Sequence, residues 1–434
     1  MSSIEMEQDL AKRLLLEDGT LVFLGVPEGT EFGIDMKSWN TAGDFRGIKM
    51  IPPGIHFIHY AAVSKTTGEV APRVGFLHHF HPKDFIVKMW NKETEDLSRD
   101  NICEESIIKL KDNLLNLDRF LAPYPYDIYE KWLSLSSNIT DSLAVMLTPE
   151  NGRISSALEL ISCDNNDRPK GKNRPKASTD IDKEESGQEQ SNIDLPQCST
   201  SAISEVDESK PKESAEDIGL AEPESPEIQV LKKRRNRPST QEEREDALLP
   251  QLKPAPGMAL RLTEFPERTY PEDATPAEIT KHCLDQTYVL DHLIKRHSRP
   301  IDIIGELEFT YVCFLVGHSL DALEQWKKLV KLFCSCEEAI HKYRNVYLQF
   351  ITSLEVQITE IPEEFLADIV MNKNLIYVKL RDFFRTVHHA EIEDRLKTAI
   401  ERFKVNLTEK FMWDFSDVNE EDDDERPVIV KLPK

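Results

Sequence analysis

Short apolar segments bounded by proline or glycine dominate the first part of the chain. They lie at residues 21–26, 54–60, 74–80 and 85–90. Runs of this length and punctuation are typical of strands rather than long helices. We therefore expect a mainly β, sandwich-like domain over residues 1–150, with helices appended at about 104–121 and 126–147.

Beyond residue 275 the apolar positions change to helical spacing. Thr275 precedes a proline and is followed three residues later by Glu278, which is the pattern of a helix start with a capping box, and Ser335 and Glu338 repeat it. Amphipathic stretches follow at 303–316, 320–333, 336–358, 363–371, 375–387 and 390–410. The pattern predicts an all-α domain of about seven helices over residues 257–415.

The segment between these domains has a different composition. No Phe, Tyr or Trp occurs between Trp132 and Phe265, and residues 151–256 are crowded with Ser, Glu, Asp, Lys and Pro. Such a composition buries too little apolar surface to offset the entropy lost on ordering. We expect a disordered, charged linker, so the predicted fold class is α+β with two domains.

The last part of the chain, residues 416–434, combines an acidic run with a strand-like end. The acidic residues fill positions 420–425, and the apolar end contains Val428, Ile429, Val430 and Leu432. A single β segment needs a sheet to join, so these four residues are predicted to bind a partner. The alternative, in which the segment folds back onto its own domain, stays open.

The composition of the whole chain argues against several classes of protein. The formal net charge of −24 argues against sequence-specific nucleic-acid binding by the chain as a whole, because such binding needs clustered Lys and Arg. The longest apolar run, residues 309–316, is too short for a membrane-spanning helix. No secretory signal is visible at the N-terminus, and seven scattered cysteines favour reduced thiols. We expect a protein of the cytoplasm and nucleus.

No motif makes a case for catalysis, a cofactor or a metal. On a strand, His79 and His81 point to one face and His78 to the other, so the three do not converge on an ion. Cys334 and Cys336 have one residue between them, where redox and zinc motifs have two, which favours buried thiols at helix ends.

Two further motifs have simpler structural explanations. Residues 317–321 begin like a nucleophile elbow but follow a helix and lack the second glycine, so Ser319 is predicted to be a helix N-cap. Gly25, Gly29 and Gly33 are predicted to be turn glycines rather than a phosphate-binding loop. The carboxylates, although many, form no recognisable acid–base pair. We predict no enzymatic activity.

One dense basic block, Lys232, Lys233, Arg234 and Arg235, lies in the linker. It is a candidate nuclear-import signal, with a simple solvated charge patch as the alternative. Ser225 and Ser239 flank the block and are candidate phosphorylation sites, whose modification would add negative charge to the linker.

Several blocks of the sequence are specific enough to carry a family resemblance. In the N-terminal part they are residues 29–35, 123–126, 131–134 and the long block 45–60 (Phe-Arg-Gly-Ile-Lys-Met-Ile-Pro-Pro-Gly-Ile-His-Phe-Ile-His-Tyr). In the C-terminal part they are residues 275–282, 305–309, 326–328, 360–362 and 411–415. Together these blocks resemble the Aar-two family of assembly factors for the U5 splicing particle.

This resemblance implies a β-sandwich-like domain and a helical, VHS-like domain joined by a variable connector. It also implies an assembly chaperone that binds the large U5 scaffold protein, Prp-eight, at its RNase H-like and Jab/MPN-like domains and excludes the Brr-two helicase until maturation. The C-terminal tail would add a strand between those domains. Two alternatives remain open at this point: a VHS-type adaptor in membrane traffic, and a hydrolase with an unrecognised site.

Overall fold

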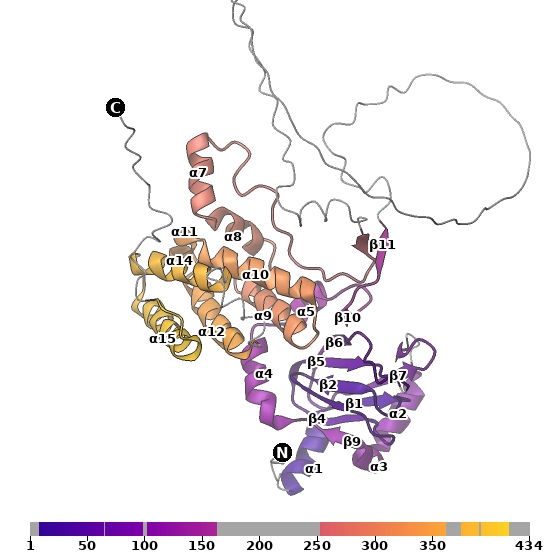
Figure 1. Ribbon diagram of the computed structural model, residues 1–434. Helices are drawn as coiled ribbons and strands as arrows, with labels where there is room; N and C mark the ends of the chain where they lie inside the picture. The colour runs from indigo at the N-terminus through magenta and orange to yellow at the C-terminus, as the bar shows by residue number, and fades with distance from the viewer. Residues whose placement is uncertain are drawn as a thin grey trace, which may run out of the picture. The chain divides into compact units, whose positions relative to one another are not determined.

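The computed structural model describes residues 8–64, 66–98, 102–162, 252–361, 375–389 and 392–415 (Figure 1). By its internal contacts the chain divides into one unit of residues 1–161 and 253–434 and a second of residues 162–252. Of the elements in the described residues, the helices and all but the last pair of strands belong wholly to the first unit. The predicted linker, with its basic block, therefore lies almost entirely outside the described residues.

The first five-stranded sheet mixes parallel and antiparallel pairs. Its strand order is β8-β7-β1-β4-β9, in which β1 runs parallel to β7 and antiparallel to β4. The members are β1 (Gly19–Leu24), β4 (Gly47–Ile51), β7 (Phe85–Asn91), β8 (Asp96–Leu97) and β9 (Leu121–Pro123). The edge strands β8 and β9 are short, so they present little unpaired backbone of their own.

The second sheet is antiparallel throughout. Its order is β10-β6-β5-β2-β3, formed by β2 (Glu31–Ile34), β3 (Lys37–Asn40), β5 (Gly54–Ala61), β6 (Val74–Phe80) and β10 (Ile154–Ser155). Gly33 lies inside β2 and not in a turn, which corrects the prediction. A Cβ atom there would lie 2.2 Å from Cε1 of His59, so only glycine fits.

Aromatic and aliphatic side chains fill the space between the two sheets. Phe23, Phe32 and Tyr60 form the centre of this core, and Trp90 packs edge-on against Phe23. The mainly β N-terminal domain is thus confirmed, and the four predicted strands appear as β1, β5, β6 and β7. Strands β2, β3, β4, β8 and β9 were not predicted, because each is at most five residues long or contains polar residues.

Several short helices accompany the sheets. Before β1 lies α1 (Gln8–Glu17), which was not predicted; Asp18 joins this helix directly to the strand. The expected helix at 104–121 is divided into α2 (Glu104–Asp112), α3 (Leu114–Leu117) and η1 (Asp118–Phe120). The expected helix at 126–147 consists of η2 (Tyr126–Ile128), α4 (Tyr129–Ser136) and α5 (Asp141–Leu147).

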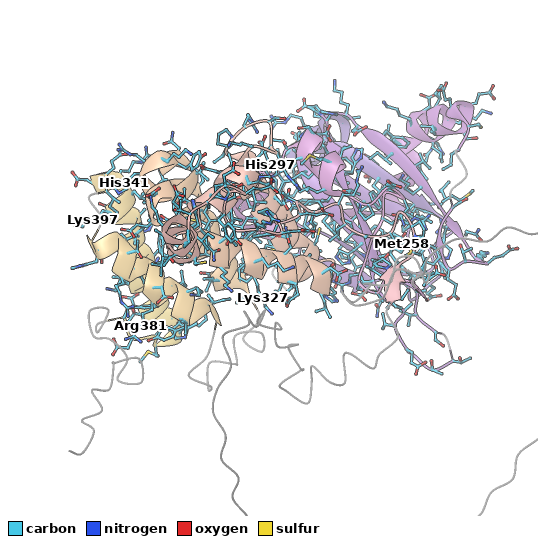
Figure 2. The ribbon with its side chains drawn as sticks, turned by 90° about the horizontal axis from the view of Figure 1, so that it is seen from above. Met258, His297, Lys327, His341, Arg381 and Lys397 are labelled. Carbon is cyan, nitrogen blue, oxygen red and sulfur yellow. The ribbon has the colours of Figure 1, made fainter. Side chains whose placement is uncertain are left out.

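The C-terminal part is all-helical in its described residues, as predicted. Its elements are α7 (Pro276–Leu284), α8 (Thr287–Ile294), α9 (Asp302–Leu315), α10 (Leu320–Cys334), α11 (Glu337–Lys342), α12 (Arg344–Glu360), α14 (Leu375–His389) and α15 (Asp394–Phe411). Figure 2 marks Lys327, Arg381 and Lys397 on α10, α14 and α15. Helix α9 is central, since nearly all its residues are buried. No helix among the described residues has the length and apolarity required to cross a membrane.

The helix starts only partly follow the capping pattern. Thr275 and Glu278 form the predicted capping box, in which the Glu278 carboxylate accepts from the Thr275 backbone N–H at 2.8 Å. Ser319 is the predicted N-cap of α10. The prediction for Ser335 was wrong, because its hydroxyl donates backward to the Lys331 carbonyl while Asp285 accepts from the backbone N–H of Glu338.

Strand β5 is buried on both faces, and this joins the sheets to the helices. Ile58 and Tyr60 face the core between the sheets, whereas Ile55 and Phe57 belong to a second core shared with α9. The β lobe (β1–β10 with α1–α5) and the helical region (α7–α15) therefore share one continuous hydrophobic core.

The chain before residue 163 and the chain after residue 251 lie next to each other. The Ala255 backbone N–H donates to the Glu159 carbonyl at 2.7 Å, next to the two-stranded sheet of β11 (Leu160–Ser162) and β12 (Leu252–Pro254). Residues 163–251 thus leave and re-enter the first unit at neighbouring points. They are not needed to span a distance between lobes.

Replacing residues 163–251 by a short Gly/Ser connection should leave the fold intact. Because loop-closure entropy depends only weakly on loop length, we expect the melting temperature to change by less than about 3 °C. Differential scanning calorimetry on the intact and shortened chains measures this. A fall of about 8 °C or more would mean that the segment contributes to the folded core.

Candidate functional site

Every residue that the sequence marked as a binding or regulatory site lies outside the described residues. This holds for the tail residues Val428, Ile429, Val430 and Leu432, for the basic block 232–235, and for Ser225 and Ser239. What the structure does describe is the point from which the tail departs and the arrangement of the family-like blocks.

The tail departs from an aromatic cluster at the end of α15. Trp413 and Phe415 are buried, and both rings pack against Tyr377 of α14, whose hydroxyl donates to the Asp414 carbonyl at 2.7 Å. Met412 adopts a left-handed backbone with φ of 57° and ends the helix. The chain up to residue 415 is therefore anchored, which fixes where the following residues begin.

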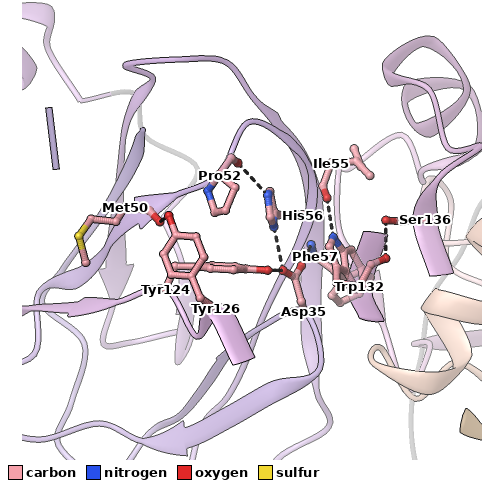
Figure 3. A network of polar contacts seen from close by, with 10 residues as sticks. All are labelled: Asp35, Met50, Pro52, Ile55, His56, Phe57, Tyr124, Tyr126, Trp132 and Ser136. Atoms are coloured by element: carbon pink, nitrogen blue, oxygen red, sulfur yellow. Dashed lines mark hydrogen bonds and ion pairs between the residues drawn. The ribbon is translucent and has the colours of Figure 1, made fainter. Parts of the chain in front are cut away.

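A buried polar network joins three family-like blocks of the β lobe (Figure 3). The Asp35 carboxylate, fully buried, accepts from the Tyr124 hydroxyl at 2.6 Å and from the Phe57 backbone N–H at 3.0 Å. His56 contacts it through Nδ1 at 2.8 Å, while Nε2 of His56 lies 2.9 Å from the Pro52 carbonyl. Burial and the neighbouring Asp35 charge raise the pKa of Tyr124, so this phenol stays a donor.

Trp132 of α4 continues the network toward the helical region. Its indole N–H donates to the Ile55 carbonyl at 2.7 Å, and its ring stacks on that of His56 (Figure 3). The side chain is fully buried within the shared core. Nearby, the Lys131 ammonium lies 2.8 Å from the Glu360 carboxylate at the end of α12.

Glu308 of α9 holds the loop between α4 and α5. Its carboxylate accepts from the Asn138 backbone N–H at 2.6 Å, the Asn138 side-chain amide at 2.7 Å and the Ser353 hydroxyl at 2.7 Å. Burial raises the pKa of Glu308 to about 7, even though these donors favour the charged form. One buried carboxylate thus connects the β lobe to two helices of the helical region.

Its neighbours in the block 305–309 complete the junction. A Cβ on Gly305 would lie 2.4 Å from the Asn138 carbonyl oxygen, so glycine permits the close approach of α9. Glu306 accepts from the Thr263 backbone N–H at 2.9 Å and hydroxyl at 2.6 Å. Burial alone would raise the pKa of Glu306, but contacts with His297 and Thr263 outweigh it and hold the pKa below its usual range.

Most family-like blocks therefore meet at this junction rather than on the surface. Asp35, His56, Trp132 and Glu308 from these blocks are all buried. Asp35 contacts His56, Trp132 donates to the Ile55 carbonyl, and Glu308 accepts from the backbone N–H of Asn138. No sequence argument assigned them a role. The sequence offered one signal of this junction, which is the pair of glutamates inside an otherwise apolar helix. A carboxylate that is buried in such a helix requires specific hydrogen-bond donors from other segments.

The motifs set aside during the sequence analysis occupy ordinary positions. The rings of His79 and His81 lie 4.8 Å apart, as expected for side chains on one strand face, while His78 binds Asp84 at 3.0 Å. Cys334 and Cys336 are free and buried, which confirms the prediction of helix-end thiols, and burial raises the pKa of both. Within the described residues, no group of three or more His, Cys, Asp or Glu is placed to hold a metal ion.

The fold and junction define a two-lobed α+β protein whose buried charged groups serve to join its lobes. Models of known protein families match the sequence of both lobes. Residues 17–149 match the AAR2 N-terminal domain, and residues 262–416 match the AAR2 C-terminal repeat region.

Curated relatives cover the whole chain. A "Protein AAR2 homolog" from Homo sapiens is 36% identical over 437 residues, covering 100% of this chain and 99% of the relative. Those from Mus musculus and Caenorhabditis elegans are 35% and 30% identical and cover 100% and 91% of this chain. The human and mouse alignments also span 99% of each relative, and the nematode one spans 94%. The chain belongs to the AAR2 family.

Gly305→Ala should weaken the junction. Alanine favours a helix intrinsically by about 1 kcal/mol, but the added methyl overlaps a backbone oxygen, so we expect a net loss of about 1–3 kcal/mol in unfolding free energy. Urea denaturation measures this loss. Gly43→Ala is the matched control, because a Cβ there meets only the Glu28 carboxylate at 3.4 Å. Equal stability of the two variants would contradict the close approach.

Glu308→Gln should change how stability depends on pH. With a folded pKa of about 7 against an ordinary 4.5, the native state binds a proton that the unfolded state has lost, so the stabilising contribution of Glu308 declines as pH rises through this interval. Glutamine does not titrate and turns an amide group toward donors. The variant should therefore be less stable at about pH 5, and its deficit should shrink by on the order of 2 kcal/mol by about pH 7.5. A deficit that stays constant or grows would contradict the raised pKa.

Proposed function

We propose that this protein is an assembly chaperone of the U5 small nuclear ribonucleoprotein in pre-mRNA splicing. It binds the large U5 scaffold protein, Prp-eight, through that protein's RNase H-like and Jab/MPN-like domains. While bound, it keeps the Brr-two helicase away from the scaffold until maturation. The observation that carries the proposal is membership of the AAR2 family across both lobes and nearly the full chain.

The anchored tail supports a mechanism of strand addition. The buried Trp413 and Phe415 anchor the chain up to residue 415, and the acidic run at 420–425 and the apolar end follow this anchor in the sequence. Val428, Val430 and Leu432 lie on one face of an extended segment, where they can enter pockets while the main chain pairs with a sheet edge. Such a segment occupies a site by position alone and needs no catalytic group.

The composition of the described junction supports a non-enzymatic role. Its buried carboxylates are engaged by donors from Asn138, Thr263 and Tyr124, which leaves them placed for structure rather than proton transfer. Exclusion of a competitor then depends on relative affinity and concentration at a shared surface. Release of this protein from the scaffold then sets the time at which the Brr-two helicase can bind.

The proposal includes a route between compartments. The protein forms its complex in the cytoplasm and reaches the nucleus, with Lys232, Lys233, Arg234 and Arg235 as the import signal. Phosphorylation at Ser225 or Ser239 would add negative charge beside that signal and weaken its docking to a receptor.

The test uses purified RNase H-like and Jab/MPN-like domains of the U5 scaffold protein with three forms of the chain. They are the intact chain, a form ending at Asp417, and a form in which Val428, Val430 and Leu432 are changed to Asn. The matched control changes Ile429 and Lys431 to Asn, on the opposite face of the segment. Calorimetry should show weakening by about tenfold or more for the truncated and three-residue forms and a smaller effect for the control.

Each outcome bears on a separate part of the proposed function. Binding that is equal in all forms would keep the scaffold interaction and discard the tail mechanism. Failure of the intact chain to bind either domain would contradict the proposed function. In a separate pull-down with the intact chain from cell extract, capture of endosomal sorting proteins in place of U5 components would favour the VHS-type adaptor.

A further inference from the structure

A lysine occupies an inward-facing position of the β-sandwich. On β7 the side chains of Ile86, Lys88 and Trp90 share one face, and both neighbours of Lys88 on that face pack into or against the core between the sheets. The Lys88 ammonium lies over the Phe76 ring of the opposite sheet, 5.3 Å from its centroid. Interior positions of a sandwich normally carry apolar residues, so a cation here needs an explanation.

Lys88 has no anionic partner among the described residues. No hydrogen bond or ion pair there involves its ammonium, and the closest charged influence is Arg153, which has the same sign and is itself paired with Asp96. Burial and Arg153 both lower the pKa of Lys88. Of the other charged groups in the vicinity, Glu104 of α2 lines the same groove without bonding to Lys88, and His78 is bound to Asp84.

The lysine opens into a groove of about 860 Å³ at the margin of the sandwich. The groove has a mixed lining: apolar side chains such as Ile86, Val87 and Ile107 alternate with polar ones, among them Ser98, Glu104, Asn151 and Arg153. It lies where the edge strands β8 and β10 are only two residues long. Helix α2 lies beside β7 (Figure 1) but buries none of its own residues, so it does not fill the space.

The main chain of β7 is also available on this side. The Thr20 backbone N–H donates to the Asp84 carbonyl, which places the main-chain groups of alternate residues, Ile86 and Lys88, toward β1. Those of Val87 face the other way. On that side β8 pairs with Trp90 and Asn91, and the Ser98 backbone N–H donates to the Met89 carbonyl at 2.7 Å; among the described residues none pairs with Val87.

We propose that this groove binds an extended, acidic and apolar peptide segment of a partner protein. A carboxylate of the segment pairs with the Lys88 ammonium, its apolar side chains cover Ile86 and Ile107, and its backbone pairs with Val87. A peptide suits the site better than a small acid, because the main chain of Val87, which no described residue pairs with, offers hydrogen bonds that another strand can use. This groove is separate from the tail and goes beyond the proposed scaffold interaction.

The test selects peptides from a random phage-displayed library on the full-length wild-type chain. The comparison chains are Lys88→Met, which keeps the length of the side chain without its charge, and Lys92→Met, an exposed lysine outside the groove. Selected peptides should contain Asp or Glu next to apolar residues. A synthetic copy of the strongest one should bind about tenfold more weakly to Lys88→Met, and also after its own acid is changed to the amide, but equally well to Lys92→Met.

Several results would overturn the proposal. They are selected peptides without an acidic preference, equal binding to the Lys88→Met chain, and no enrichment over empty support. Formation of dimers by the wild type but not by Lys88→Met would assign the groove to a second copy of the chain instead.

Stability provides an independent check. Because Lys88 has no partner within the described chain, Lys88→Met should keep or raise the melting temperature. A decrease of about 5 °C or more would reveal a partner inside the chain and contradict a vacant groove.

Discussion

The burial of β5 on both faces is the constraint on which the rest of the structure depends. A strand with one face on the core between the sheets and the other on α9 cannot leave either neighbour without exposing apolar surface. Phe57 and Trp132 belong to the same core as the central helix, so the β lobe and the helical region form one folding unit.

This constraint explains why so many charged groups are buried at the junction. A continuous apolar seam would attach the lobes without fixing their register, whereas carboxylates need donors at defined points. Asp35, Glu306 and Glu308 each accept from a backbone N–H of another segment; Asp35 holds strand β5, whereas Glu306 and Glu308 each hold a loop. Among these carboxylates, Glu308 ties the loop between α4 and α5 of the β lobe to α9 and α12 of the helical region. A binding surface composed of both lobes can keep its shape only if this connection holds.

The sequence predicted the elements that follow local rules and missed those that depend on distant packing. Strands bounded by proline or glycine and the Thr275 capping box were found, because turn and cap chemistry is local. The helix expected at 336–358 is instead divided at Tyr343, and Ser335 caps nothing, because Asp285 from another loop supplies the acceptor. Likewise, neither the partners of Glu308 nor the inward position of Lys88 follows from the order of residues, since both depend on which surfaces meet.

The most direct test of the shared core is equilibrium unfolding in urea, followed by hydrogen exchange with mass spectrometry on peptides from β2, β5, α9 and α12. If the two lobes form one unit, peptides from all four elements should lose protection at the same urea concentration, in a single cooperative transition. Loss of protection in β2 at a clearly lower or higher concentration than in α12 would show that the lobes unfold separately, and would contradict the account.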